Sequence, residues 1–197
     1  MKKVFSIIFF SLGIFYLSKT GYILIKSELS QYFIHQAWQT TLLDKENHKP
    51  WTWADTFPIM QLRFPRINQS SYILDGASLR NMAFSAARMS SSGMPGQSKT
   101  TVVSGHKDSH FEYLKNIRIG DKIIVQDKNQ SHQFIVKATN IIDSKKEKIL
   151  IRNINELVLT TCYPFSDFQF GGSLRFIVYA VPINTENKTQ NITYTNN

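Results

Sequence analysis

Residues 158–165 of this 197-residue chain read Val-Leu-Thr-Thr-Cys-Tyr-Pro-Phe. The β-branched and apolar residues of Glu156–Cys162 favour a strand, because such side chains fit the pleated surface of a sheet. Tyr163-Pro164 stops that strand abruptly, and the end of a strand presents its last side chain at a surface. Cys162 is therefore either a reactive surface thiol or an inert core residue, and position alone does not decide between them.

Cys162 is the only cysteine of the chain. It has no partner for an intramolecular disulfide, and a structural zinc site would need several cysteines and histidines together. His106, Asp108 and His110 alternate in a pattern that could ligate a metal, but no further ligand cluster accompanies them. We therefore expect no metal and no other cofactor.

Short apolar segments separated by turns make up most of the chain around this strand. Two brief stretches have helical spacing, Ser78–Arg88 and Phe111–Asn116. Seven or more strands at this spacing suggest a mostly β fold, a closed or nearly closed barrel with short helices. The other strand candidates are Ile59–Phe64, Tyr72–Leu74, Thr100–Ser104, Lys122–Gln126, Gln133–Ile142 and Leu174–Val181.

The N-terminus has the pattern of a membrane address. Lys2 and Lys3 precede an apolar run, Val4–Leu17, which reaches the roughly 20 residues of a membrane span if it is extended to Ile25. A cleaved signal peptide would end in small residues of the Ala-x-Ala kind, and 17–30 offers none. We therefore favour an uncleaved transmembrane helix over a cleaved signal.

The charged residues predict how the anchor is oriented and which kind of partner the protein has. Lysines before the span favour a cytoplasmic N-terminus and an exported domain, although Lys19 and Lys26 beyond the span weaken that argument. The chain carries 23 Lys and Arg against 14 Asp and Glu, a net charge of +9. It has no nucleic-acid-binding motif, so we expect a membrane surface rather than a nucleic acid as partner.

The chain divides into four parts by composition. Residues 1–27 form the predicted anchor, and residues 28–48 a helical linker whose apolar residues from Leu29 to Leu42 have near-helical spacing. The predicted barrel occupies 49–183. The polar tail, 184–197, is rich in Asn and Thr and is predicted to be disordered.

Two further residues stand where chemistry could occur. His106 follows the strand candidate Thr100–Ser104 through a glycine, and Arg175 begins the last strand candidate, 13 residues after Cys162. A loop histidine commonly has no role, and an arginine at a strand start is usually a solvated charge. Arg175 could instead offer forked, permanently charged donors to a developing oxyanion.

In this order the three residues resemble the sortase family. The match is to its Thr-Leu-x-Thr-Cys signature at 158–162, with Val158 in the first position, a preceding His and a following Arg. Residues 49–62, 93–121 and 159–165 resemble the proteobacterial class GN sortases, although His-Lys-Asp at 106–108 stands where that subgroup would have His-Arg-Asp. The resemblance implies an eight-stranded β-barrel.

The resemblance also implies a mechanism. Cys162 would attack a Thr–Gly-like peptide bond in the C-terminal sorting motif of a partner protein and form a thioester. His106 would transfer protons, Arg175 would hold the substrate or the oxyanion, and an amine acceptor would resolve the thioester. Thr161 is placed in substrate binding by its position alone. The enzyme is expected in the inner (cytoplasmic) membrane as a single-pass protein, with its catalytic domain facing the periplasm.

Smaller roles and rival functions stay open. We expect Asp108 to cap a short helix starting near Ser109 rather than to orient His106. Trp51 and Trp53 resemble a subgroup signature, yet packing explains them equally well. The main rival function is a membrane-tethered barrel that binds a peptide without catalysis, which predicts an unreactive thiol. A second is a cysteine hydrolase, in which water rather than an amine resolves the thioester.

Overall fold

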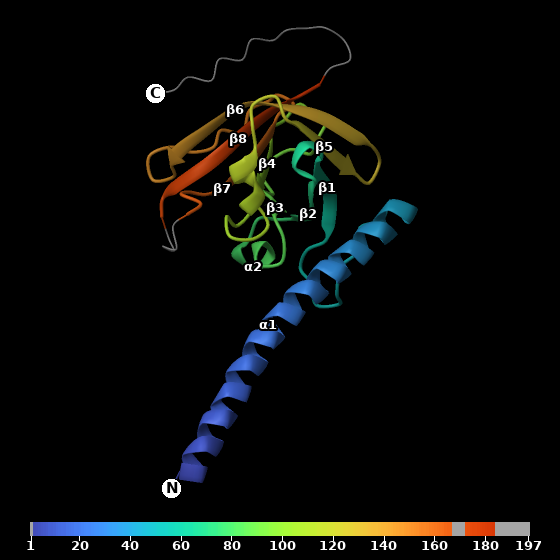
Figure 1. Cartoon of the computed structure of the whole chain (residues 1–197). Helices are drawn as coiled ribbons and strands as arrows, with labels where there is room; N and C mark the ends of the chain where they lie inside the picture. Colours follow the sequence, from blue (N-terminus) through green and yellow to red (C-terminus); the bar gives the residue numbers. More distant parts are fainter. Residues whose placement is uncertain (1, 167–171, 184–197) are drawn as a thin grey trace.

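The computed structural model describes residues 2–166 and 172–183, in which strands predominate around a long N-terminal helix (Figure 1). The strands are β1 (Pro58–Phe64), β2 (Gln69–Asp75), β3 (Ala87–Arg88), β4 (Thr101–Ser104), β5 (Lys122–Asp127), β6 (Ser131–Asp143), β7 (Leu157–Cys162) and β8 (Leu174–Pro182). The helices are α1 (Lys2–Asp44), η1 (Pro65–Ile67), α2 (Leu79–Met82) and η2 (Glu112–Asn116).

The eight strands form a closed barrel in the order β1-β2-β3-β4-β7-β8-β6-β5. This confirms the prediction of a mostly β barrel with short helices. Strands β4 and β7 run parallel, and β7 and β8 run antiparallel. The end of β4, the end of β7 and the start of β8 therefore meet at one rim of the barrel.

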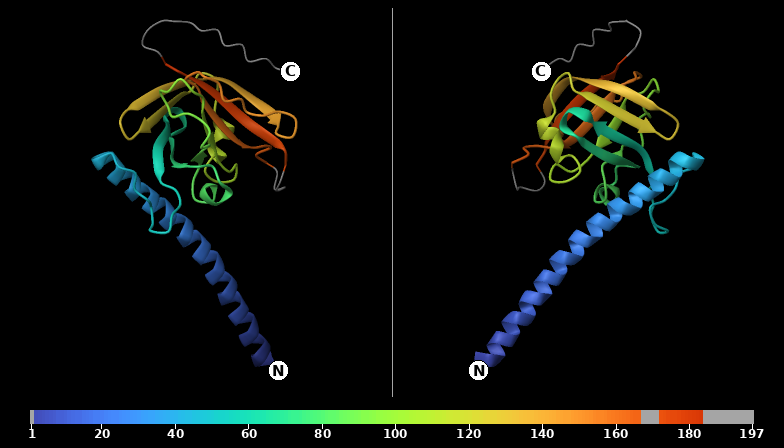
Figure 2. Two further views of the ribbon diagram at one scale, coloured as in Figure 1. Left: turned by 180° about the vertical axis from the view of Figure 1, so that it is seen from behind. Right: turned by 45° about the vertical axis from the view of Figure 1, so that its right-hand side comes forward.

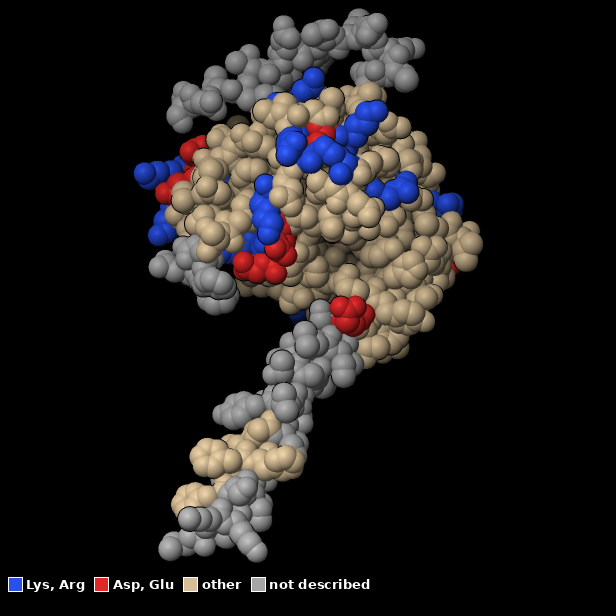
Figure 3. All heavy atoms as spheres, viewed as in Figure 1, with Lys and Arg blue, Asp and Glu red and all other residues tan. Residues whose placement is uncertain are grey.

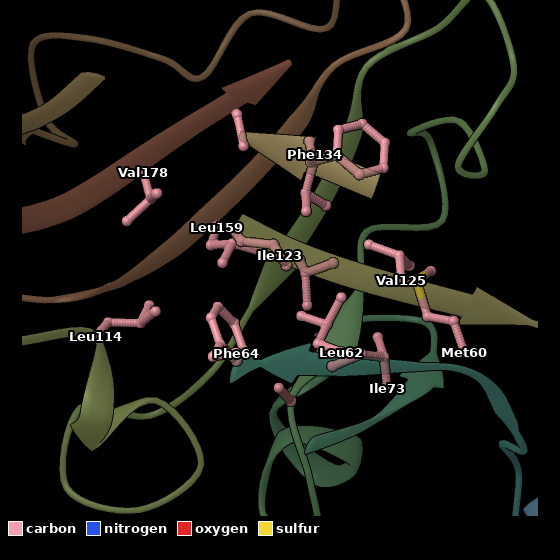
Figure 4. Close-up of a cluster of buried hydrophobic side chains, with 14 of the residues drawn as sticks. Met60, Leu62, Phe64, Ile73, Leu114, Ile123, Val125, Phe134, Leu159 and Val178 are labelled. Atoms are coloured by element: carbon pink, nitrogen blue, oxygen red, sulfur yellow. The ribbon is translucent and has the colours of Figure 1, made fainter. Parts of the chain in front are cut away.

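Alternating apolar side chains fill the barrel. Strands β1, β5, β6, β7 and β8 each contribute alternate residues, as expected for a sheet with one face in the core. Figure 4 shows side chains from β1, β2, β5, β6, β7 and β8 meeting in this cluster, with Leu114 of η2 beside them. The fully buried members include Leu62, Phe64, Ile73, Ile123, Val125, Phe134, Leu159 and Val178. This core gives the rim a rigid base.

The seven strand candidates are all present, and the differences lie in the short elements. The helix predicted over Ser78–Arg88 is wrong beyond Met82, because the chain straightens to form β3. Strand β3 has only two residues, which is too short to show a period of two. The hydroxyl of Ser78 caps α2 by accepting a hydrogen bond from the backbone N–H of Asn81 at 3.1 Å. The second predicted helix is the 3₁₀ helix η2.

Helix α1 is continuous across the predicted boundary between anchor and linker. Its C-terminal half packs on the barrel, where Ile34 and Trp38 are fully buried and Nδ1 of His35 lies 2.6 Å from the hydroxyl of Tyr72. Its N-terminal half extends away from the barrel (Figure 2). Within the described residues, no helix meets the length and apolarity needed to span a membrane. The predicted disorder of 184–197 lies outside the described residues.

Candidate active site

Cys162 is the point at which β7 reaches the surface. The side chains from Leu157 to Thr161 are all buried, whereas Cys162 is half-buried and carries a free thiol. Pro164 follows and ends the ladder. The abrupt end that the sequence predicts thus leaves a thiol accessible at the rim.

His106 reaches the same rim through the register of β4. Ser104 pairs with Thr160 in the parallel ladder, and the backbone N–H of Gly105 donates to the carbonyl of Thr160 at 3.1 Å. Because the two segments advance together, His106 stands two residues beyond this pair, as Cys162 does on β7. The side chain of His106 is exposed, which leaves its imidazole open to solvent.

The turn that carries His106 depends on the glycine before it. A Cβ atom at Gly105 would lie 2.8 Å from ring carbons of the buried Phe111. The N–H of Phe111 donates to the carbonyl of His106 at 3.0 Å and closes the turn. Gly105 therefore permits the close approach of Phe111, and that approach sets the path of the chain at His106.

Arg175 is the direct partner of Cys162 across β7 and β8. The N–H of Tyr163 donates to the carbonyl of Leu174 at 3.0 Å and extends the pairing past the strand end. Nη1 of Arg175 donates to the carbonyls of Gly172 at 2.7 Å and Leu174 at 2.9 Å, so the half-buried guanidinium lies against its own loop. The register thus places Cys162 between Arg175 on β8 and the turn after β4 that carries His106.

Thr161 does not present its hydroxyl to the surface. It is buried, and its Oγ1 donates to the carbonyl of Gly105 at 2.8 Å. This bond links the cysteine strand to the histidine turn. A role for Thr161 in substrate binding stays a prediction, because its hydroxyl is already hydrogen-bonded to the backbone.

The predicted capping role of Asp108 is wrong. Helix η2 starts at Glu112, with Phe111 at the N-cap position and no side-chain cap. Residues 107–111 form turns instead of the start of a helix, because the N–H of Phe111 bonds back to His106. Asp108 is mostly exposed, and its Oδ1 lies 3.8 Å from Nζ of Lys107.

Lys107 is a residue of this site that sequence reasoning passed over. It is buried, with 7% of its surface exposed, and its Nζ donates to the carbonyl of Pro164 at 3.0 Å. The sequence offered one signal, the lysine in His-Lys-Asp where arginine was expected. Its burial could not be read from that signal, because Pro164 lies 57 positions away in the sequence.

A second imidazole, that of His110, lies near His106. Burial lowers the pKa of His110, the charge of His106 lowers that pKa further, and a hydrogen bond with the backbone of Ala83 opposes both effects. These effects together favour the neutral form of His110, and His106 is the exposed imidazole of the two. Residues 2–166 and 172–183 contain no group of three or more His, Cys, Asp or Glu side chains that could hold a metal.

The charges on the face shown in Figure 3 form separate groups. Lys and Arg side chains lie in several places on the barrel, and Asp or Glu side chains accompany many of them. This distribution agrees with the scattered basic residues of the sequence. At this rim a thiol, an imidazole and a guanidinium come from adjacent segments of the chain, and these three groups are suited to nucleophilic attack on a carbonyl carbon.

Comparisons with known proteins identify the family and the fold of the chain. The Sortase domain family matches residues 62–183, more than half of the chain. Sortase D of Bacillus subtilis (strain 168) is 28% identical over 120 residues, which are 60% of each protein, so the chain spans 60% of the length of that relative. Two solved structures share the fold. The Clostridium perfringens Sortase D5 transpeptidase has 15% identity and a TM-score of 0.65 over 80% of this chain and 99% of that one. A lid mutant of Corynebacterium diphtheriae Sortase A has 17% identity and a TM-score of 0.60 over 81% and 92%.

Proposed function

The chain belongs to the sortase family, and we propose that it is a cysteine transpeptidase with Cys162 as nucleophile. The observation that carries this proposal is the strand register, which pairs Cys162 with Arg175 and aligns it with His106. The single, half-buried free thiol adds support, because a nucleophile must be reachable.

The first half of the reaction forms an acyl-enzyme. The thiolate of Cys162 attacks the carbonyl carbon of a Thr–Gly-like bond, and a C–S bond forms. The C–N bond then breaks, and the leaving amine takes a proton from His106. The product is a thioester between Cys162 and the upstream part of the substrate protein.

The second half transfers the acyl group. An acceptor amine attacks the thioester carbonyl and gives a proton to His106, and the C–S bond breaks to restore the thiolate. Water in place of the amine would give hydrolysis. Arg175 would donate hydrogen bonds to the oxyanion that develops in each half, which requires its guanidinium to turn from Gly172 and Leu174 toward the thiol.

The substrate is proposed to be a protein with a C-terminal sorting motif, and the acceptor an amine. We place the enzyme in the class GN subgroup on the resemblance of residues 49–62, 93–121 and 159–165. We place it in the inner membrane, anchored by the N-terminal half of α1, with the barrel in the periplasm. The apolar run Val4–Leu17 supports this placement, as do Phe9 and Phe10, which are more than 70% exposed.

A trapping experiment tests the chemistry without knowledge of the natural substrate. The full chain is incubated with a pool of synthetic peptides that contain Thr-Gly with varied preceding residues, with and without hydroxylamine. Mass spectrometry should find a thioester adduct on Cys162 and a peptide hydroxamate. Cys162→Ala should lose both, and His106→Ala should slow hydroxamate release by about 10²-fold or more.

Two controls complete the test. His48→Ala, in the loop that follows α1, removes a histidine outside the site and should keep the wild-type rate. Circular dichroism should show that each variant is folded. An unmodified Cys162 throughout would favour the peptide-binding rival, and a product identical with and without the amine would favour the hydrolase.

A further inference from the structure

We infer that Lys107 is a positioning residue, which holds the segment after Cys162 against the turn that carries His106. This inference rests on the proposed transpeptidase function and deepens it. The main observation behind it is the hydrogen bond from Nζ of Lys107 to the carbonyl of Pro164, which is 3.0 Å long and lies at the rim of the barrel.

The burial of Lys107 is unusual for its residue type. Its side chain is only 8% exposed, and lysine is almost never buried unless its ammonium has partners. Removing an ammonium from water carries a large free-energy cost, which a charge-assisted hydrogen bond to a carbonyl offsets in part. The nearby carboxylate of Asp108 is 63% exposed and 3.8 Å away, too solvated to account for the burial. The hydrogen bond to the carbonyl of Pro164 is one contact that offsets this cost.

Among the described residues, hydrogen bonds on both sides of His106 and Cys162 join the histidine segment to the cysteine segment. The N–H of Gly105 donates to Thr160, the carbonyl of Gly105 accepts from Thr161, and the ammonium of Lys107 donates to Pro164. The first two bonds come before the catalytic pair along both segments, and the third comes after it. His106 and Cys162 are therefore held between bonds at both ends.

The bond from Lys107 is the one that a strand register cannot supply. The ladder of β4 and β7 ends with Ser104 and Thr160, and Pro164 has no N–H to extend a ladder. Beyond this point the cysteine segment turns toward residues 165–166, where the ring of Phe165 packs on Phe176 of β8. Lys107 ties that departing segment back to the turn that follows β4, so its loss frees one side of the thiol.

This geometry predicts an effect on the chemical steps rather than on binding. A misplacement of about 1 Å between reacting groups can lower a rate by about 10²-fold, while contacts remote from the bond keep their affinity. Lys107→Met keeps the length of the side chain and loses its charge and its donors. Lys107→Arg keeps a cation and donors at the same place.

The experiment compares these two variants with Lys122→Met, a matched change at an exposed lysine of β5. The best Thr-Gly peptide of the trapping pool is the substrate, and hydroxylamine is the acceptor. We expect Lys107→Met to lower kcat by about tenfold or more with KM within about twofold of wild type. Lys107→Arg should recover most of kcat, and Lys122→Met should match wild type.

Several results would overturn the inference. A wild-type kcat in folded Lys107→Met, a change confined to KM, or an equal loss in Lys107→Arg would each remove the positioning role. If Lys107→Met does not fold, ¹⁵N-lysine NMR of the wild-type chain decides. A slowly exchanging ammonium signal that disappears in Lys107→Arg supports the buried contact with Pro164, and its absence removes that contact. A wild-type chain without any thioester would instead defeat the proposed function.

Discussion

The guanidinium of Arg175 belongs to the direct strand partner of the proposed nucleophile, yet it already has hydrogen-bond partners of its own. Nη1 donates to two carbonyls of its own chain, so this nitrogen does not point freely toward a substrate. The planar fork of arginine has five donors, which allows it to keep one backbone contact while turning another N–H toward an oxyanion. A lysine in the same place has a point charge and no fork.

Arg175→Lys therefore separates charge from geometry. We expect this variant to lose about 10²-fold in kcat, nearly as much as Arg175→Ala, because a point charge cannot keep the loop contact and bind the oxyanion together. The measurement is steady-state hydroxamate formation. Arg63→Lys, on an exposed position of β1, is the matched control. Near-normal kcat in Arg175→Lys would reduce the role of Arg175 to that of a charge.

The sequence indicated Cys162, His106 and Arg175 because each stands at a strand end that local pattern can place. Strand ends depend on glycine and proline next to short β-rich runs, and these are local signals. Lys107 was missed for the opposite reason, since its burial depends on a carbonyl supplied by a distant segment. Asp108 was misplaced because a turn closed by His106 and Phe111 replaced the expected start of a helix.

At the scale of elements, the link between η2 and β5 rests on one carboxylate. Asp121 is 7% exposed, accepts a bidentate pair of hydrogen bonds from Arg66, and accepts the N–H of Arg118 at 2.8 Å. The Arg66 guanidinium is the main cause that holds the pKa of Asp121 below its ordinary value of 3.8. The ionised form of Asp121 is therefore the one that the fold stabilises.

Asp121→Asn should lower the free energy of unfolding near neutral pH by about 1–2 kcal/mol, since charge-assisted hydrogen bonds are lost. A lowered pKa contributes stability above the unfolded value of 3.8, and this contribution disappears as the pH falls below it. The difference in the free energy of unfolding between wild type and variant should therefore become smaller as the pH falls through 3.8. Urea unfolding of both proteins at pH 7 and at pH 3 measures this difference at each pH.

The control for Asp121→Asn is Asp55→Asn, in the exposed pair of Asp55 with Arg80. Exposed ion pairs contribute little, so this variant should change the urea midpoint less than Asp121→Asn does. A difference between wild type and Asp121→Asn that stays constant between pH 7 and pH 3 would contradict the assignment of the lowered pKa to Asp121.

The elements that the sequence predicted were those with a clear period. Seven strands showed alternation or β-rich composition over at least three residues, and all are present. Strand β3 escaped because two residues have no period, although it bridges β2 and β4 and closes the barrel. The order of strands also depends on pairings between distant segments, such as β4 with β7, which local pattern does not contain. A closed or nearly closed barrel was expected from the strand spacing, whereas the number of eight strands was expected from the family resemblance alone.

At the scale of the whole molecule, helix α1 packs on the barrel through its C-terminal half and extends away from it through its N-terminal half. The loop before β1 and helix α2 lie at the end of the barrel past which α1 extends toward its N-terminus (Figures 1 and 2). Trp53 in that loop is 61% exposed, and the guanidinium carbon of Arg80 lies 5.9 Å from the centre of its ring. Exposed tryptophan beside a cation is a combination that suits the boundary between lipid headgroups and water.

The proposed anchor therefore predicts that Trp53 meets the membrane surface. When the full chain is reconstituted into vesicles of brominated phosphatidylcholine, we expect tryptophan fluorescence to be quenched, most strongly by bromines close to the headgroups. Trp53→Phe should remove most of this quenching. Trp38→Phe should not, because Trp38 is fully buried between α1 and the barrel and too far from lipid to be quenched.

Equal quenching in both variants would place Trp53 away from the bilayer, and a chain that stays in solution apart from the vesicles would refute the anchor itself. The two outcomes differ physically, since the first concerns the tilt of the barrel on its helix and the second the partition of 1–27 into lipid, which burial of apolar side chains drives.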